Sequence, residues 1–273
     1  MAREWLSRGD SREVMFVGTE RGMEKKLVPQ AGLPLETIRS AGLKGMGPVR
    51  LARNLAQLGP ALWDSDRILR RHNFAAAFGA GGYAAGPVLL MAELHGLPSV
   101  IFEPNAEPGF TNRVLANMAT RIAVGYPSAA VRLGRRAVIT GCPVRREFFY
   151  AEERPPAPPY RLLITGGSQG AHVINAAMIA ALDFLAAHRS RLSIVHQTGE
   201  RDYNEVREAY ARHEFQAEVA PFLSDMPEQF AAADLIVCRS GAVTVAEVAA
   251  AGRAALFIPF GAATDSHQLR NAE

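Results

Sequence analysis

The sequence predicts an α/β protein of two nucleotide-binding-type domains, with parallel sheets that face one cleft. Short apolar segments alternate with helix-like segments along both halves of the 273 residues, a pattern typical of βα units. A proline-rich stretch at 152–159 separates the halves, because its four prolines exclude helix and central strand. Each half also has a glycine loop between a strand and a helix, at 79–86 and 166–170.

The proline-rich stretch also sets the expected domain boundaries. A chain of this length is long enough for two hydrophobic cores. We expect a first domain at 1–150, a linker at 151–160 and a second domain at 161–273.

The elements of the first half are expected where apolar runs and helical periodicity alternate. After a short opening helix, strands are expected at 14–17, near Leu35, and at 74–78, 99–102 and 122–124. Helices are expected from about 21, through a basic segment ending at Arg71, at 87–95, and at 111–119 with Thr111 as its N-cap.

The second half repeats the same alternation. Strands are expected at 162–165, 192–196, 217–220, 235–238 and 255–258. Helices are expected at 171–187, 203–212, 226–232 and 245–251, and from 268 onward. The last of these has no cap or glycine stop before Glu273, so the C-terminal end is expected to be cut.

The composition favours a soluble or peripheral protein of a reducing compartment. Charged residues, histidine or proline interrupt every apolar run before it reaches membrane-spanning length. Charges in the first ten residues argue against a secretory signal. Cys142 and Cys238 lie far apart without a CxxC partner, so no disulfide framework is expected. His196, His213 and His267 lack metal-ligand spacing, and no metal site or cofactor is expected.

Basic residues gather in one segment between 39 and 71. Its seven basic and two acidic residues give a local charge of +5 against +3 for the whole chain, and leucines recur there at helical spacing. Two interpretations stay open: a core-facing stripe with a solvated basic face, or a patch on an anionic membrane surface, where each basic residue contributes about 1 kcal/mol. Nucleic acid is not expected, because aromatics are not interleaved with the charges. The residues are Arg39, Lys44, Arg50, Arg53, Arg67, Arg70 and Arg71, with Asp64 and Asp66, and the stripe is Leu51, Leu55, Leu58 and Leu62 beside Trp63.

The loop at 166–170 reads Gly-Gly-Ser-Gln-Gly and suits a phosphate. Glycines let the backbone approach an anion, and the first N–H groups of the following helix point toward it. A tight strand-to-helix turn without a ligand is the alternative interpretation.

Three further segments carry candidate ligand contacts. Thr244 and Glu247 fit a capping box, yet a carboxylate in that position also suits sugar hydroxyls. Glu103 and Asn105 follow the expected strand at 99–102, at the mouth of the sheet, where an ordinary loop is equally compatible. Arg145 precedes the linker, where a guanidinium suits an anionic ligand.

Together these segments resemble the MurG family, which transfers N-acetylglucosamine to an undecaprenyl-diphosphate-linked muramyl-peptide in cell-wall synthesis. The resemblance is collinear over essentially the whole chain. It rests on VGTERG at 17–22, GGY at 81–83 with Gly86-Pro87, EPN at 103–105, Thr111-Asn112, GCPVR at 141–145, GGSQGA at 166–171, HQTG at 196–199 and CRSGAVTVAE at 238–247.

The resemblance implies the GT-B architecture, two Rossmann-like domains with parallel sheets facing a central cleft, both incomplete here. It implies that the muramyl 4-hydroxyl attacks UDP-N-acetylglucosamine and releases UDP in one inverting step, without a metal, at the cytoplasmic face of the bacterial inner membrane. Glu103 is the carboxylate nominated near the acceptor. The implied substrate-binding residues are Asn105, Arg145, Ser168 at the diphosphate, Leu223 by the uracil, Ala242, Val243, Thr244, Val245, Ala246, Glu247 at the ribose, and Gln268 at the donor sugar.

The chain departs from the family pattern at its ends and at Pro104. Family members begin with a strand and a Gly-Gly-Thr-Gly-Gly-His loop, whose histidine is the favoured base, and this sequence starts after it. The remainder of the second domain and the final helix are also expected to be missing, and Pro104 replaces a glutamine. Loss of a central strand leaves neighbouring strands unpaired, so we expect the chain as written to be unstable or inactive. A non-catalytic UDP-sugar-binding module and a GT-B transferase with another acceptor are the alternatives.

Overall fold

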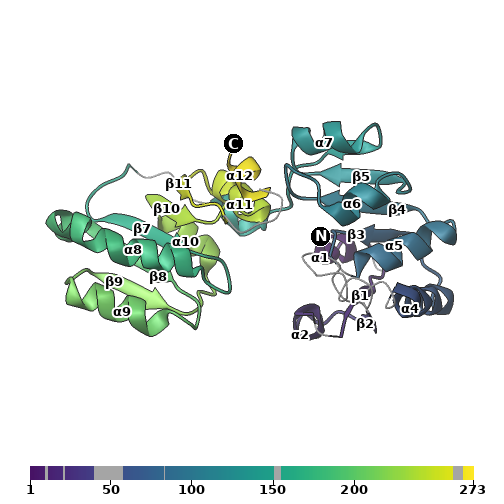
Figure 1. Ribbon diagram of the computed structural model, residues 1–273, viewed down its shortest axis with the longest axis horizontal. Helices are drawn as coiled ribbons and strands as arrows, with labels where there is room; N and C mark the ends of the chain where they lie inside the picture. Colours follow the sequence, from purple (N-terminus) through teal and green to yellow (C-terminus); the bar gives the residue numbers. More distant parts are fainter. Residues whose placement is uncertain (10–11, 21, 40–57, 83, 151–154, 261–266) are drawn as a thin grey trace, which may run out of the picture. The chain divides into compact units, whose positions relative to one another are not determined.

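The structure, a computed structural model, describes residues 1–273 except 10–11, 21, 40–57, 83, 151–154 and 261–266. It divides into two compact units, Met1–Gly141 and Cys142–Glu273 (Figure 1). The expected boundary at 150 lies inside the second unit rather than between the units. The reason is the 3-10 helix η1 (Arg146–Tyr150), whose Phe148 is buried in a core cluster of the second unit.

The first unit contains two parallel sheets, one of two strands ordered β1-β2 and one of four ordered β3-β4-β5-β6. Its strands are β1 (Phe16–Thr19), β2 (Leu35–Ile38), β3 (Ala77–Gly79), β4 (Ser99–Glu103), β5 (Arg121–Val124) and β6 (Ala137–Ile139). Its helices are α1 (Ala2–Leu6), α2 (Glu24–Gln30), α4 (Leu58–Arg71), α5 (Ala85–Leu94), α6 (Phe110–Leu115) and α7 (Pro127–Leu133).

The two sheets of the first unit share one helical layer although no ladder joins them. Val17 of β1 and Ile38 of β2 pack with Ile68 of α4 and Val88 of α5 in a single cluster. In the described residues β1 has β2 as its ladder partner and β3 has β4.

The second unit is one parallel sheet of five strands in the order β11-β10-β7-β8-β9. The sequence places α9, β9, α10 and β10 at the bounds that the structure has, and places the other strands and helices within three residues of them. The strands are β7 (Tyr160–Thr165), β8 (Leu192–Gln197), β9 (Ala217–Ala220), β10 (Leu235–Cys238) and β11 (Ala254–Phe257). The helices are α8 (His172–Leu185), η2 (Ala186–Arg191), α9 (Tyr203–Arg212), α10 (Met226–Ala232), α11 (Ala242–Ala251) and α12 (His267–Ala272).

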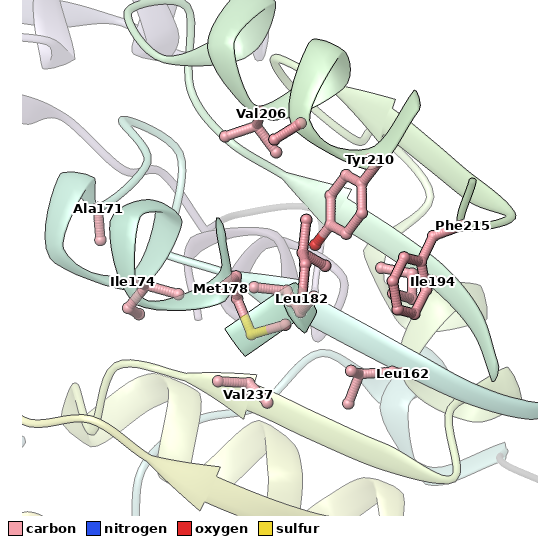
Figure 2. Close-up of a cluster of buried hydrophobic side chains, with 12 residues drawn as sticks. Leu162, Ala171, Ile174, Met178, Leu182, Ile194, Val206, Tyr210, Phe215 and Val237 are labelled. Atoms are coloured by element: carbon pink, nitrogen blue, oxygen red, sulfur yellow. The ribbon is translucent and has the colours of Figure 1, made fainter. Parts of the chain in front are cut away.

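One face of this sheet is covered by α8 and α9 over a continuous apolar core (Figure 2). Helix α8 contributes Ile174, Met178 and Leu182, whose spacing of four places them on one helical face. They pack with residues of the strands and of α9, among them Ile194 and Val206. Each such fully buried aliphatic side chain contributes about 1.5–3 kcal/mol to folding.

Helix α4 differs from the stripe that the sequence predicts. Its buried face is formed by Ala61, Ser65 and Ile68, while Leu58 and Leu62 are half-buried and Trp63 is 57% exposed. The buried face therefore lies beside the predicted leucine stripe and contains the small residues Ala61 and Ser65. The Ser65 hydroxyl is satisfied within the helix, because it donates to the Ala61 carbonyl at 2.7 Å. Lys44, Arg50, Leu51, Arg53 and Leu55 lie outside the described residues.

Candidate functional site

The carboxyl ends of β7 and β10 mark the point where the chain order of the second sheet reverses. The two strands are neighbours, but β7 leads through α8 to β8 on one side, and β10 leads through α11 to β11 on the other. Ligands of open α/β sheets bind in the crevice at such a switch point. Most of the sequence-predicted donor contacts follow strands of this sheet along the chain: Ser168 after β7, Leu223 after β9, Ala242 to Glu247 after β10, and Gln268 after β11.

The side chain of Gln197, at the end of β8, forms a hydrogen bond with the glycine loop after β7. The Gln197 amide nitrogen donates to the Gly167 carbonyl at 2.8 Å, and the Gly167 N–H donates to the Thr165 hydroxyl at 3.1 Å. The Gln197 side-chain oxygen accepts the Leu223 N–H at 2.8 Å. One buried side chain therefore ties the Ser168 loop to the Leu223 segment, while Ser168 itself stays exposed at the loop tip.

The loop at 166–170 also lies backbone to backbone against the loop at 196–199. Gly170 has a φ of 73°, and a Cβ there would overlap the Thr198 carbonyl. Gly199 has a φ of 77°, and its Cβ would overlap the Gln169 carbonyl. Both positions require glycine for conformation and for space, since other residues pay about 1–2 kcal/mol for the left-handed region alone.

A buried polar network supports the 196–199 loop from inside the unit. Asn175 of α8 donates to the Thr198 carbonyl at 2.9 Å and to Asp202 at 2.8 Å, so its own side-chain oxygen faces His196 at 3.0 Å. His196 Nε2 must then donate, and Nδ1 accepts from the Tyr210 hydroxyl at 2.9 Å. Burial lowers the pKa of His196 to about 4, which keeps the ring neutral.

Helix α11 begins earlier than the sequence predicts, and the predicted capping box is wrong. The N-cap is Gly241, with an extended backbone and no side-chain cap hydrogen bond. Thr244 and Glu247 therefore lie inside the helix, too far along it to bond the N-cap donors. A capping role therefore does not explain the position of Glu247.

Glu247 is a partly buried carboxylate. Burial raises its pKa, and the positive charge of Arg145 acts in the opposite direction. Arg145 lies before η1, with its guanidinium carbon 5.0 Å from the centre of the Phe148 ring. The structure thus brings together two of the predicted donor contacts, one anionic and one cationic, beside α11.

Gln268 and Leu223 follow the two outer strands of the second sheet, β11 and β9. The Gln268 side-chain oxygen accepts the Phe260 N–H at 2.9 Å, which joins α12 to the segment after β11. Leu223 is buried in the same apolar cluster as Phe148, Phe230 and Val248. A uracil at this position would meet backbone and apolar surface rather than charge.

In the first unit, Glu103 is the last residue of β4 and Asn105 follows it, and the Glu103 carboxylate is engaged in internal hydrogen bonds. One carboxylate oxygen accepts from the Asn105 N–H at 2.9 Å and its side-chain nitrogen at 3.1 Å. The other accepts from the Gly109 N–H and the Asn112 side chain, both at 2.8 Å. These four donors fill the lone-pair positions of a carboxylate that is 1% exposed. The nomination of Glu103 as a catalytic group is therefore unsupported by its geometry.

Glu103 instead closes the loop between β4 and α6. Helix α6 starts at Phe110 with Gly109 as its N-cap, so the prediction of Thr111 as the cap is wrong. The Glu103 carboxylate accepts the N–H of the N-cap residue Gly109, and Asn112 in the first turn of α6 donates to both Glu103 and the Phe102 carbonyl. The local sequence does not reveal this, because the partners are separated by six to ten residues.

Two absences hold for the part of the chain that the structure describes. There, no group of three or more His, Cys, Asp or Glu residues is placed to hold a metal ion. None of the described helices has the length and apolar character needed to cross a membrane.

Gln197, Asn175 and Asp202 are functional candidates that sequence reasoning missed. One signal in the sequence could have indicated them: a Gln or Asn stands next to a glycine loop, at a position where apolar residues are usual. A buried polar side chain of this kind needs hydrogen-bond partners. The partners come from segments 23 to 30 residues apart, so the spacing within the sequence gave no indication.

Comparison with family models agrees with this division into two nucleotide-type domains. Residues 8–124 match the glycosyltransferase family 28 N-terminal domain, and residues 161–273 match the glycosyltransferase family 28 C-terminal domain. The fold and the site at the switch point therefore define a glycosyltransferase with the GT-B architecture.

Curated relatives and a solved structure narrow the class further. The chain is 45% identical to a Geotalea uraniireducens protein and 44% identical to a Pelobacter propionicus protein, covering all of this chain and 76% and 78% of theirs. Both are named UDP-N-acetylglucosamine--N-acetylmuramyl-(pentapeptide) pyrophosphoryl-undecaprenol N-acetylglucosamine transferase. A crystal structure of Acinetobacter baumannii MurG matches with a TM-score of 0.77 and 32% identity over 99% of this chain and 76% of that one. The chain belongs to the MurG family.

Other solved structures share the fold alone. A UDP-GlcNAc 2-epimerase from Neisseria meningitidis, solved with UDP-GlcNAc, matches with a TM-score of 0.62 at 11% identity over 93% of this chain and 76% of that one.

Proposed function

We propose that this chain transfers N-acetylglucosamine from UDP-N-acetylglucosamine to the 4-hydroxyl of undecaprenyl-diphosphate-linked N-acetylmuramyl-pentapeptide. The names of its relatives state this donor sugar and this acceptor. The muramyl hydroxyl attacks the anomeric carbon, the bond to UDP breaks, and the configuration inverts.

The donor diphosphate is proposed to lie at the Ser168 loop. The loop exposes Ser168 and backbone N–H groups just before α8, a helix of 14 residues whose dipole favours an anion there. The rigid attachment of the loop through Gln197 means that little ordering remains for the ligand to impose. Helix ends and basic side chains can stabilise the leaving diphosphate as its charge develops.

The observation that carries the proposal is the environment of Glu247. A partly buried carboxylate on α11, at the switch point, costs folding free energy and makes no cap hydrogen bond. Such a group is explained by a ligand that donates hydrogen bonds to it, and a ribose offers two hydroxyls. The other proposed donor contacts in the second unit are Arg145, Leu223, Ala242, Val243, Thr244, Val245, Ala246 and Gln268.

The general base remains unassigned among the described residues, because Glu103 has no lone pair left for the acceptor proton. This observation favours one second candidate, a module that binds the UDP-sugar without turning it over.

The proposed location is the cytoplasmic face of the inner membrane, with the protein held peripherally. The support is α4, where exposed Trp63 lies with the guanidinium carbons of Arg39 and Arg67 at 5.7 and 5.6 Å from its ring centre. Arg39 and Arg70 are paired with Asp64 and Asp66, which reduces their attraction to anionic lipid. Flotation with anionic and neutral vesicles tests this, and equal recovery on both would contradict it.

The transfer itself is tested with radiolabelled UDP-N-acetylglucosamine and a soluble lipid-linked acceptor analogue. Label appearing in the acceptor supports the transferase. Calorimetric binding of the donor without transfer supports the binding module, and transfer to a different acceptor in a panel supports another specificity.

A further inference from the structure

Phe148 lies where three proposed donor contacts converge. It is 1% exposed, and its ring meets Phe230 of α10 edge-on, with centroids 5.1 Å apart. The guanidinium carbon of Arg145 lies 5.0 Å from the same ring centre, although Arg145 is itself exposed. The Phe148 ring thus packs against the apolar core and also has the Arg145 guanidinium over its face.

The core cluster around Phe148 extends to the other two contacts. Leu223, the residue proposed to lie by the uracil, belongs to it and is 7% exposed. Val248 and Ala251 of α11 belong to it as well, on the helix that carries Glu247. Displacing the ring would therefore change the positions of Arg145, of Leu223 and of α11 together.

We propose that Phe148 is a positioning residue for donor binding, which holds the Arg145 guanidinium over its ring and beside α11, where that cation acts on Glu247. The inference rests on the proposed function, since it concerns affinity for a UDP-sugar. Phe148 is itself buried and acts through Arg145 and Glu247.

The electrostatic consequence follows from the charges around Glu247. Arg145 lowers the pKa of this carboxyl against the larger effect of burial. Burial, and to a smaller extent the charge of Glu247, raises the pKa of Cys238 of β10. The elements packed on α11 also carry Arg146 and Glu147 on η1, Glu228 on α10, and His267 and Arg270 on α12. Among the described residues, Arg145 is the one charge that shifts the pKa of Glu247. Releasing Arg145 from the ring moves that titration to higher pH.

The test compares Phe148→Leu with Phe230→Leu in the full chain. Both remove one buried aromatic ring from the same cluster, and Phe148 alone has a guanidinium over its ring. Two quantities are measured: the dissociation constant of UDP-N-acetylglucosamine by calorimetry, and the titration of the Glu247 carboxyl by ¹³C NMR without donor. Phe148→Met, whose flexible side chain fills irregular gaps without a ring, replaces Phe148→Leu if the latter does not fold.

The expected result is that the Phe148 variant weakens donor binding about two- to fivefold, the range of one exposed cation–π contact. Its Glu247 titration shifts to higher pH, and both changes vanish in an Arg145→Gln background. Equal effects of the two Phe→Leu variants, or an unshifted Glu247 titration, would overturn the inference. If the unaltered chain binds no donor, the proposed function fails, while the titration still decides the role of Phe148.

Discussion

The side-chain nitrogen of Gln197 lies 2.8 Å from the Gly167 carbonyl oxygen and donates a hydrogen bond to it. The oxygen of the same side chain accepts the Leu223 N–H, also at 2.8 Å. Gln197 is 1% exposed and Leu223 is 7% exposed, so water does not reach the contact between them. The geometry of the proposed diphosphate and uracil positions therefore depends on one amide.

Replacing Gln197 with methionine is expected to weaken UDP-N-acetylglucosamine binding about tenfold, because two buried backbone groups lose their partner. Gln229→Met is the matched control: Gln229 is also buried and also bridges two groups, Arg161 at 2.8 Å and Asp225 at 2.6 Å. Thermal unfolding should show that both variants lose stability. Calorimetry should show loss of affinity in Gln197→Met alone, and equal losses would remove the special role of Gln197.

Gly170→Ala is expected to disrupt the donor loop, whereas Gly167→Ala is expected to be mild. Both glycines have left-handed backbone angles, 73° and 85°, so each substitution costs about 1–2 kcal/mol of backbone strain. A methyl group at Gly170 additionally overlaps the Thr198 carbonyl, while the space at Gly167 is open. Denaturant unfolding and donor titration of both variants measure the difference. Similar losses at the two positions would contradict the close approach of the two loops.

Glu103→Gln separates a structural carboxylate from a catalytic base. A glutamine amide nitrogen would face N–H donors such as Gly109 and Asn112, and two donors cannot form a hydrogen bond with each other. The variant is therefore expected to lose about 2–3 kcal/mol of stability. The pH dependence of kcat for whatever transfer remains should keep its shape, because no titrating base has been removed. Loss of the acidic limb of that profile, with stability unchanged, would restore Glu103 as the base.

The pH dependence of stability should report His196. Its pKa is about 4 in the folded chain against 6.5 for the free side chain, so the unfolded chain binds the proton more readily. The neutral His196 ring therefore contributes to the free energy of unfolding above pH 6.5, and this contribution is lost as the pH falls toward 4. The loss between pH 7 and pH 5 is about 2 kcal/mol. Urea unfolding at the two pH values measures it. His196→Gln should flatten this dependence, and an unchanged slope would contradict the assignment.

The sequence predicts elements well where periodicity and breakers agree. Helix α9 and strand β10 have the expected bounds because apolar spacing and turn residues coincide there. Helix α7 and strand β6, with seven and three residues, were not predicted, since segments this short carry no full period. The predicted capping box at Thr244 and Glu247 is wrong because the same spacing also occurs inside a helix. Here the N-cap is Gly241, whose lack of a side chain gives no capping signal in the sequence.

The candidate site was predictable only where a local pattern carries it. The glycine loop and the carboxylate at 247 follow strand ends, and the topology places them at one sheet edge. The bond from Gln197 to Gly167 and the contact of Arg145 with Phe148 depend on tertiary packing, to which sequence periodicity does not extend. The internal bonding of Glu103 could not be read from its neighbours in sequence for the same reason.

The central claim is that Glu247 accepts hydrogen bonds from the donor nucleotide. It is tested most directly by calorimetric titration of the full chain and of Glu247→Gln with UDP-N-acetylglucosamine, with Glu228→Gln on α10 as an exposed control. The account predicts one site per chain and a loss of about tenfold or more in affinity for Glu247→Gln. It also predicts that this variant is more stable than the unaltered chain at neutral pH, because burial raises the pKa of Glu247 and its charge is costly there. Unchanged affinity in Glu247→Gln, or no binding by the unaltered chain, would contradict it.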